Sequence, residues 1–253
     1  MKYRAFLLYL FIILIITLGT TSDVIAAKYE VGIEDKSSLI WKCNVYNKEK
    51  MDEIFGMDWD IGAGFFKNME EGARMKWKIQ KIENNIKTYS ERIKRDEEAL
   101  GITYDVWSWT KDEEWGNKNY KEQSIFFKNP NHYPEHYLFL DYAPLWFPVP
   151  TSEYLKALKP NLYAGYTVDV TFLLTFTCEV EKGDKEGGNP SEYVKILAIY
   201  NPQGILTSYK LYITNHYVMI DVSLDSQFIY QFPVFIALLV IFSVGLICIY
   251  KKI

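Results

Sequence analysis

Apolar and polar residues alternate along most of the chain with the two-residue period of half-buried β-strands. The clearest runs are SLIWKCNVY from Ser38, ARMKWKIQKIEN from Ala73 and GITYDVWSWT from Gly101. In the second run the alternation slips near Lys81, which is typical of a β-bulge. Residues 165–183 alternate strongly from Val168 to Cys178 and are expected to form a long strand.

The last part of the body has the pattern of an antiparallel meander. Residues 192–224 contain three strand-like runs joined by short turns. The first turn, residues 201–204, is Asn-Pro-Gln-Gly, with proline and glycine where a type I β-turn favours them. Residues 214–216 make the second turn. Earlier in the chain, residues 124–142 look like two short strands around an Asn-Pro turn.

Two short segments have helical features instead. Residues 48–56 are expected to form a short helix that Gly56 closes. Residues 152–159 follow Thr151, which can serve as an N-cap, and this helix must end before Pro160.

The charged segment 85–101 is harder to assign. Its apolar residues, including Ile86, Ile93 and Leu100, fall near helical spacing, which predicts a helix crossing one face of the sheet. Two paired strands of a charged hairpin are the alternative, and the pattern leaves it open.

The first 26 residues have the three parts of a secretory signal. Lys2 and Arg4 precede an apolar stretch, and small residues make Ala26 a suitable cleavage point. An uncleaved anchor is the alternative, because the apolar stretch is short for a membrane span.

A second apolar run lies near the other end. Residues from Phe232 to Tyr250 carry no charge, and Lys251 and Lys252 follow them. Such a run is long enough to cross a bilayer, and the lysines favour the cytoplasmic side. We therefore expect a type I protein of the cell membrane with its body outside the cell. Its expected parts are a signal peptide (1–26), an extracellular β-rich domain (27–227), a transmembrane helix (228–250) and a cytoplasmic tail (251–253).

The predicted fold class is mainly β with minor α. We expect a curved antiparallel sheet or half-barrel of roughly eight to ten strands, with one to three short helices packed on it. One C-terminal transmembrane helix completes the prediction.

The net charge of the chain limits the classes of molecule that it is expected to bind. The chain has 28 basic and 32 acidic residues and a formal net charge of −4. Four of the basic residues but only one of the acidic ones lie in the two end segments, so the body is more acidic than the whole chain. This argues against nucleic acid and against electrostatic adhesion to anionic lipid. The expected partners are the membrane and a lipid-like ligand or envelope protein.

Three cysteines are too few for a disulfide scaffold. Cys248 lies in the apolar C-terminal run, whereas Cys43 and Cys178 both lie in the body. These two are a candidate disulfide, and two small buried apolar residues are the alternative.

No residue set requires a chemical reaction. His132, Glu135 and His136 have helical spacing, but Pro134 breaks a helix between the histidines, so no metal site is predicted.

The remaining catalytic patterns are also missing from the sequence. The carboxylates at Asp58 and Asp60 and at residues 112–114 lack the pattern of a calcium loop. There is no nucleophile elbow and no phosphate-binding loop. We predict no enzyme and no cofactor.

Four runs together resemble the archaeal choice-of-anchor S domain proteins, which are seen widely in Asgard archaea. They are VGIEDKSSLIWKCNVYN, ITYDVWSWT, LWFPVPTSEYLKAL and AIYNPQGILTSYKLY. The resemblance extends from about Val31 to about Val222. It implies a secreted or surface domain whose C-terminal anchor varies, and it implies no active site.

The apolar stretch 143–154, which contains three prolines, carries more apolar surface than a loop needs. One hypothesis is a binding protein whose curved sheet encloses a groove for a hydrophobic or lipid-like ligand or an envelope component. The groove candidates are Trp77, Trp107, Trp109, Trp146, Phe147 and Leu155. The alternative is a structural or adhesion module in which the same residues fill a solid core, and a surface hydrolase is a minor third hypothesis.

Overall fold

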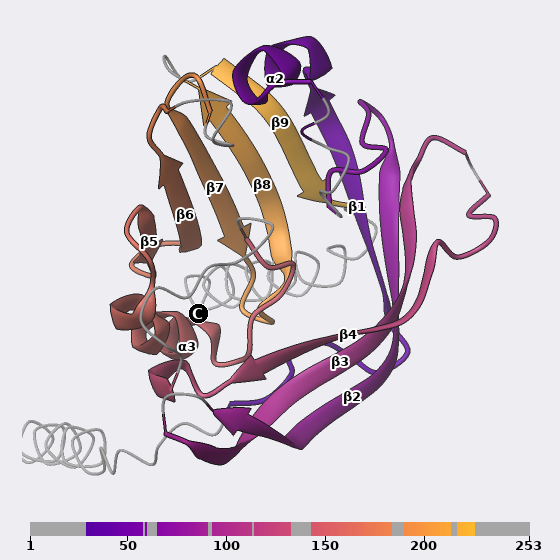
Figure 1. Ribbon diagram of the computed structural model, residues 1–253. Helices are drawn as coiled ribbons and strands as arrows, with labels where there is room; N and C mark the ends of the chain where they lie inside the picture. Colours follow the sequence, from indigo (N-terminus) through magenta and orange to yellow (C-terminus); the bar gives the residue numbers. More distant parts are fainter. Residues whose placement is uncertain are drawn as a thin grey trace, which may run out of the picture.

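The computed structural model describes residues 29–57, 59, 65–90, 93–112, 114–132, 143–183, 190–213 and 217–225. Within these ranges the chain forms one open, strongly curved, nine-stranded antiparallel sheet in the order β4-β3-β2-β1-β9-β8-β7-β6-β5 (Figure 1). The strands are β1 (Ser38–Tyr46), β2 (Arg74–Ser90), β3 (Arg95–Thr110), β4 (Tyr120–Lys128), β5 (Tyr166–Asp169), β6 (Leu174–Val180), β7 (Val194–Tyr200), β8 (Leu206–Ile213) and β9 (Tyr217–Leu224). The prediction of a mainly β chain with an antiparallel sheet is confirmed.

Two short α-helices accompany the sheet in the described residues, α2 (Lys48–Phe55) and α3 (Thr151–Leu158). The side chain of Asn47 caps α2 by accepting a hydrogen bond from the backbone N–H of Lys50 at 3.0 Å. The predicted cap of α3 is wrong. Thr151 is the first residue of that helix, after Pro150, and no side chain caps it. Two 3-10 turns, η1 (Pro130–His132) and η2 (Lys159–Asn161), complete the helical elements.

The predicted helix within 85–101 is also wrong, and the hairpin alternative is correct. β2 and β3 pair antiparallel from Arg74 and Thr110 to Ser90 and Arg95. Register shifts between Ile79 and Lys81 and between Glu83 and Ile86 each place an extra residue in β2. At such a bulge, successive inward-facing residues are three or four positions apart in the sequence instead of two. That spacing is the same as the spacing of residues on one face of a helix. The bulge predicted near Lys81 is thereby confirmed.

The meander of the last three strands is confirmed, including its first turn, in which Gly204 donates its N–H to the carbonyl of Asn201 at 2.9 Å. The long strand expected in 165–183 is instead the hairpin of β5 and β6. Val168 and Phe176 are paired across this hairpin and are both buried. The alternation continued through the turn because both arms have the same two-residue period.

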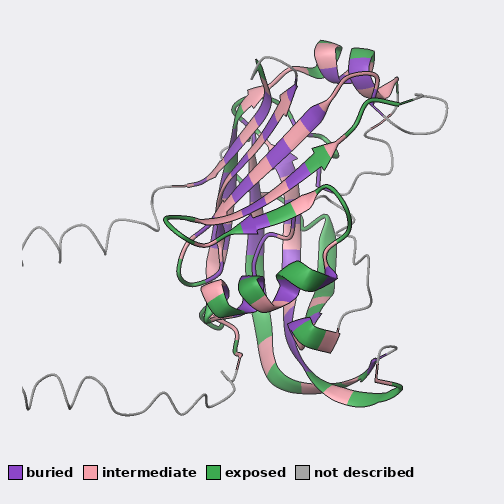
Figure 2. Ribbon diagram, turned by 90° about the vertical axis from the view of Figure 1, so that its left-hand side faces the viewer, coloured by how far each residue is buried: buried purple, intermediate pink, exposed green. Residues whose placement is uncertain are grey.

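The proline-rich residues 143–150, which directly precede α3, pack on the inner side of the curved sheet. Trp146 forms a bridge with Ile205 at the start of β8, and the N–H of Phe147 donates to the carbonyl of Gly204 at 2.7 Å. α3 lies at the open side of the curved sheet (Figure 1). Figure 2 shows buried and partly buried positions alternating along the strands, as expected for a sheet with one face on a core.

None of the helices in the described ranges has the length and apolar character needed to cross a bilayer. The predicted signal peptide (1–26), transmembrane helix (228–250) and tail (251–253) lie outside the described residues.

Candidate functional site

Five of the six groove candidates belong to the apolar core, namely Trp77, Trp109, Trp146, Phe147 and Leu155. Trp146, Phe147 and Leu155 are 0% exposed. The ring of Trp77 stacks on Tyr104 with centroids 3.9 Å apart. Trp109 donates its Nε1–H to the carbonyl of Phe65 at 2.6 Å. These side chains therefore contact other parts of the core.

The sixth candidate, Trp107, lies on the outer face of the sheet. β3 has an extra residue between the pairs Lys76–Trp107 and Arg74–Thr110, so Trp107 and Trp109 do not share a face. The Nζ of Lys76 lies 4.1 Å from the ring centroid of Trp107, whose Nε1–H donates to Gly116. The expectation that all three sheet tryptophans line one surface assumed an unbroken alternation.

The candidate disulfide is absent, because Cys43 and Cys178 are both free and buried. Cys43 lies in β1 and Cys178 in β6, and three strands separate β1 from β6 in the sheet. Burial raises the pKa of the Cys43 thiol to about 12 and that of the Cys178 thiol to about 11. The alternative of two small buried residues is correct.

The described residues contain no cluster of three or more histidine, cysteine or carboxylate side chains that would hold a metal ion. The Nδ1 of His132 lies 2.5 Å from Oε2 of Glu97 in β3. Glu135, His136, Asp58 and Asp60 lie outside the described residues.

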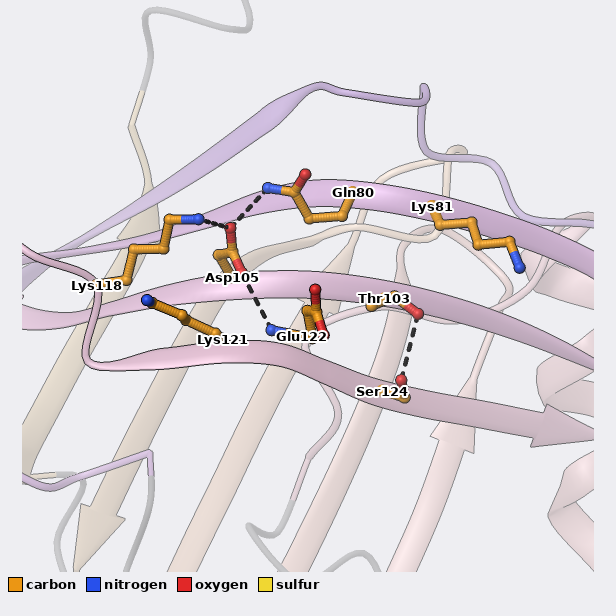
Figure 3. Close-up of a pocket in the computed structure, with 8 residues that line it drawn as sticks. All are labelled: Gln80, Lys81, Thr103, Asp105, Lys118, Lys121, Glu122 and Ser124. Atoms are coloured by element: carbon orange, nitrogen blue, oxygen red, sulfur yellow. Dashed lines mark hydrogen bonds and ion pairs between the residues drawn. The ribbon is translucent and has the colours of Figure 1, made fainter.

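A polar pocket of about 480 Å³ lies on the outer face, where β2, β3 and β4 run side by side (Figure 3). Its lining residues are Gln80, Lys81, Thr103, Asp105, Lys118, Lys121, Glu122 and Ser124. None of the six groove candidates lines it. Its volume is within the range of pockets that hold small ligands, about 300–1,000 Å³.

Asp105 is the fixed centre of this pocket, and its side chain is 2% exposed. It accepts hydrogen bonds from Nζ of Lys118 at 2.5 Å, from Nε2 of Gln80 at 2.7 Å and from the N–H of Glu122 at 3.0 Å. The carboxylate thus joins β3 to β2, β4 and the segment before β4. Burial alone raises the pKa of Asp105, but these bonds outweigh it and hold the pKa below its ordinary value.

This lowered pKa makes the stability of the fold depend on pH. The folded carboxylate binds its proton less readily than the unfolded one, so its contribution is complete above about pH 4 and is lost as the pH falls through the folded pKa. We expect Asp105→Asn to lower the free energy of unfolding near neutral pH. In acid, the difference between the variant and the parent should be smaller. Urea unfolding of both proteins at about pH 7 and about pH 3 measures this. An equal difference at both values would contradict the assignment.

The surroundings of the pocket are basic although the chain is acidic. Arg74, Lys76 and Lys78 occupy alternate positions of β2 and therefore share its outer face. Burial, together with the charge of Lys78, lowers the pKa of Lys76. Lys121 has no ion pair with any residue in the described ranges. Positive charge gathered on this part of the outer face favours the binding of an anion.

The other lining groups are suited to hydroxyl groups. Oγ1 of Thr103 and Oγ of Ser124 lie 3.2 Å apart and can each donate or accept. Gln80 supplies an amide, and Glu122 supplies a carboxylate at the pocket wall. The arrangement offers several donors and acceptors beside positive charge, and it contains no histidine or cysteine.

The sequence pattern did not identify this pocket. Lys118 and Lys121 fall in a polar stretch that reads as an ordinary solvated loop, and Gln80 and Ser124 are unremarkable strand residues. The available signal was Asp105 itself, a carboxylate in the middle of an aromatic strand, because buried carboxylates need partners.

Comparison with known proteins gave no match: no family model, no curated protein and no solved structure is significantly similar to this chain.

Proposed function

We propose that this chain is a non-enzymatic cell-surface protein, anchored by a single C-terminal helix, that binds an acidic, hydroxyl-rich component of the cell envelope. The outer-face pocket around Asp105 is the proposed binding site. The observation that carries the proposal is the combination of a basic, hydroxyl-lined pocket with an acidic chain. Membership of the archaeal choice-of-anchor S domain proteins is part of the same proposal.

The burial of the inner-face aromatics supports an envelope component over a hydrophobic ligand. A lipid-binding groove requires apolar side chains that face an unfilled space. Trp146 instead lies 4.8 Å from the ring of Phe127, and Phe147 lies 4.8 Å from the ring of Tyr200, measured between centroids. The solid-core alternative therefore fits these contacts, and binding is assigned to the outer face.

A carboxylated oligosaccharide has the chemistry that this pocket would recognise. Its carboxylate groups would lie against Lys121 and against Lys81, whose Nζ also contacts Oε1 of Glu83 at 2.6 Å. Its hydroxyl groups would lie against Thr103, Ser124 and Gln80. Exposed charge pairs are weakened by salt, so the interaction would be salt-sensitive. The hydrogen bonds of Asp105 to Lys118 and Glu122 would hold residues 118–122 in place before the ligand binds. This order reduces the entropy cost of binding.

The test is calorimetric titration of the full chain in detergent with trigalacturonate, using maltotriose as a neutral control with the same number of rings. We expect binding of trigalacturonate only, weakened several-fold by Lys121→Ala and by added salt. Lys195→Ala is the matched control, since Lys195 is exposed on β7 and pairs with Glu179 at 2.8 Å, away from the pocket. Equal affinity for both sugars, or an unchanged affinity of Lys121→Ala for trigalacturonate, would contradict the proposal.

A further inference from the structure

The turn between β5 and β6 presents two large apolar side chains to solvent. Phe172 is 93% exposed and Leu173 is 57% exposed, and they are neighbours in the chain. Thr171 beside them is also exposed. A pair of adjacent apolar residues that is this exposed marks an interaction site more often than a single exposed side chain does.

Hydrogen bonds hold this turn in shape. Oδ1 of Asp169 accepts from the N–H of Thr171 at 2.8 Å, and the hydroxyl of Thr175 donates to the carbonyl of Asp169 at 3.2 Å. The hydroxyls of Thr167 and Thr177 are bonded across the same hairpin. The outward direction of Phe172 is therefore part of an ordered hairpin.

The strand register places this turn at the end of the sheet where the described chain leaves β9. Thr175, Ile199, Ser208 and Ser223 form one row across β6, β7, β8 and β9. β6 begins immediately before this row, and β9 ends immediately after it, at Leu224. The turn and the exit of β9 are three strand spacings apart, about 14 Å along the sheet.

We propose that the β5–β6 turn inserts Phe172 and Leu173 into the bilayer surface beside the membrane anchor. This inference rests on the proposed C-terminal anchor. The chain from Asp225 to Phe228, where the expected transmembrane helix begins, reaches at most about 11 Å. That length keeps the end of β9 close to the membrane, and the neighbouring turn with it. Insertion would fix the orientation of the sheet relative to the bilayer by a second contact.

The test uses the full chain in phosphatidylcholine vesicles with a nitroxide at position 172. Phe172→Cys is introduced together with Cys248→Ser, and the buried Cys43 and Cys178 are retained. The matched control is Met57→Cys, which is 80% exposed and follows α2, at the opposite end of the strands. Power saturation compares collisions with oxygen, which partitions into lipid, and with a water-soluble nickel complex.

We expect a several-fold higher ratio of oxygen to nickel accessibility at position 172 than at position 57. Equal, water-like ratios in protein that floats with the vesicles would overturn the inference and leave the anchor intact. Protein that does not float with the vesicles would refute the anchor and the inference together. A strong 172–172 dipolar coupling that persists at high lipid dilution would also overturn it, because it would show contact with a second copy.

Discussion

Replacing Trp146 with alanine is expected to reduce the free energy of unfolding by about 3–5 kcal/mol, the usual cost of removing a large buried aromatic side chain. Trp146 is 0% exposed and packs edge-to-face on Phe127. Its backbone forms a bridge with Ile205 beside β8, so the indole lies where the proline-rich stretch meets the sheet. Urea unfolding followed by tryptophan fluorescence, with the full chain in mild detergent, measures the loss.

Trp146→Phe is the matched control. Among the described residues, the buried Nε1 of Trp146 has no hydrogen-bond partner, so the indole also carries the cost of an unsatisfied donor. Phenylalanine loses some packing but removes that cost, and we expect it to stay within about 1 kcal/mol of the parent. A cost of about 0.5 kcal/mol or less for Trp146→Ala is typical of a residue that lines an open groove. That result would restore the hydrophobic-ligand hypothesis.

The sequence predicted the parts of the fold where one simple period continues undisturbed. β1 begins at Ser38 and ends at Tyr46, as its alternation indicates, and α2 ends at Phe55, before Gly56. These segments follow local rules, because alternate burial and a closing glycine act within a few residues.

The errors occurred where an element depends on its neighbours. The bulges of β2 produced a helix-like spacing, and the bulge of β3 separated Trp107 from Trp109. Because the alternation extends across the β5–β6 turn, the pattern predicted one long strand where the structure has a hairpin. Each of these features is set by pairing with another strand, and the pattern within a single segment does not contain that information.

The candidate site was missed for a related reason. Asp105, Gln80 and the N–H of Glu122 come from three separate strands, and they meet only because those strands are adjacent in the sheet. The groove hypothesis was based on the large aromatic residues, because such side chains commonly line ligand pockets. In this fold they supply the core, and the ordinary polar residues of the outer face form the pocket.

Gly204→Ala is the second substitution expected to have a large effect, about 3 kcal/mol or more of lost stability. Gly204 has φ of +77°, which L side chains rarely adopt. A Cβ there would lie 1.9 Å from the carbonyl oxygen of Phe147 and 3.1 Å from Oγ1 of Thr151. The turn would have to move away from the proline-rich stretch. The hydrogen bond from Phe147 to Gly204 and the packing of that stretch on β8 would then be lost.

Gly116→Ala separates the backbone penalty of Gly204→Ala from the clash. Gly116 has φ of +56°, and a Cβ there would have no described atom within 4 Å. Its alanine variant should therefore cost only about 1–2 kcal/mol, the penalty of the left-handed conformation. The excess cost at Gly204, measured by urea unfolding of both variants, reports the contact between the turn and the proline-rich stretch. Equal losses at the two positions would mean that this stretch does not pack on β8, and the solid-core argument for an outer-face binding site would lose its main support.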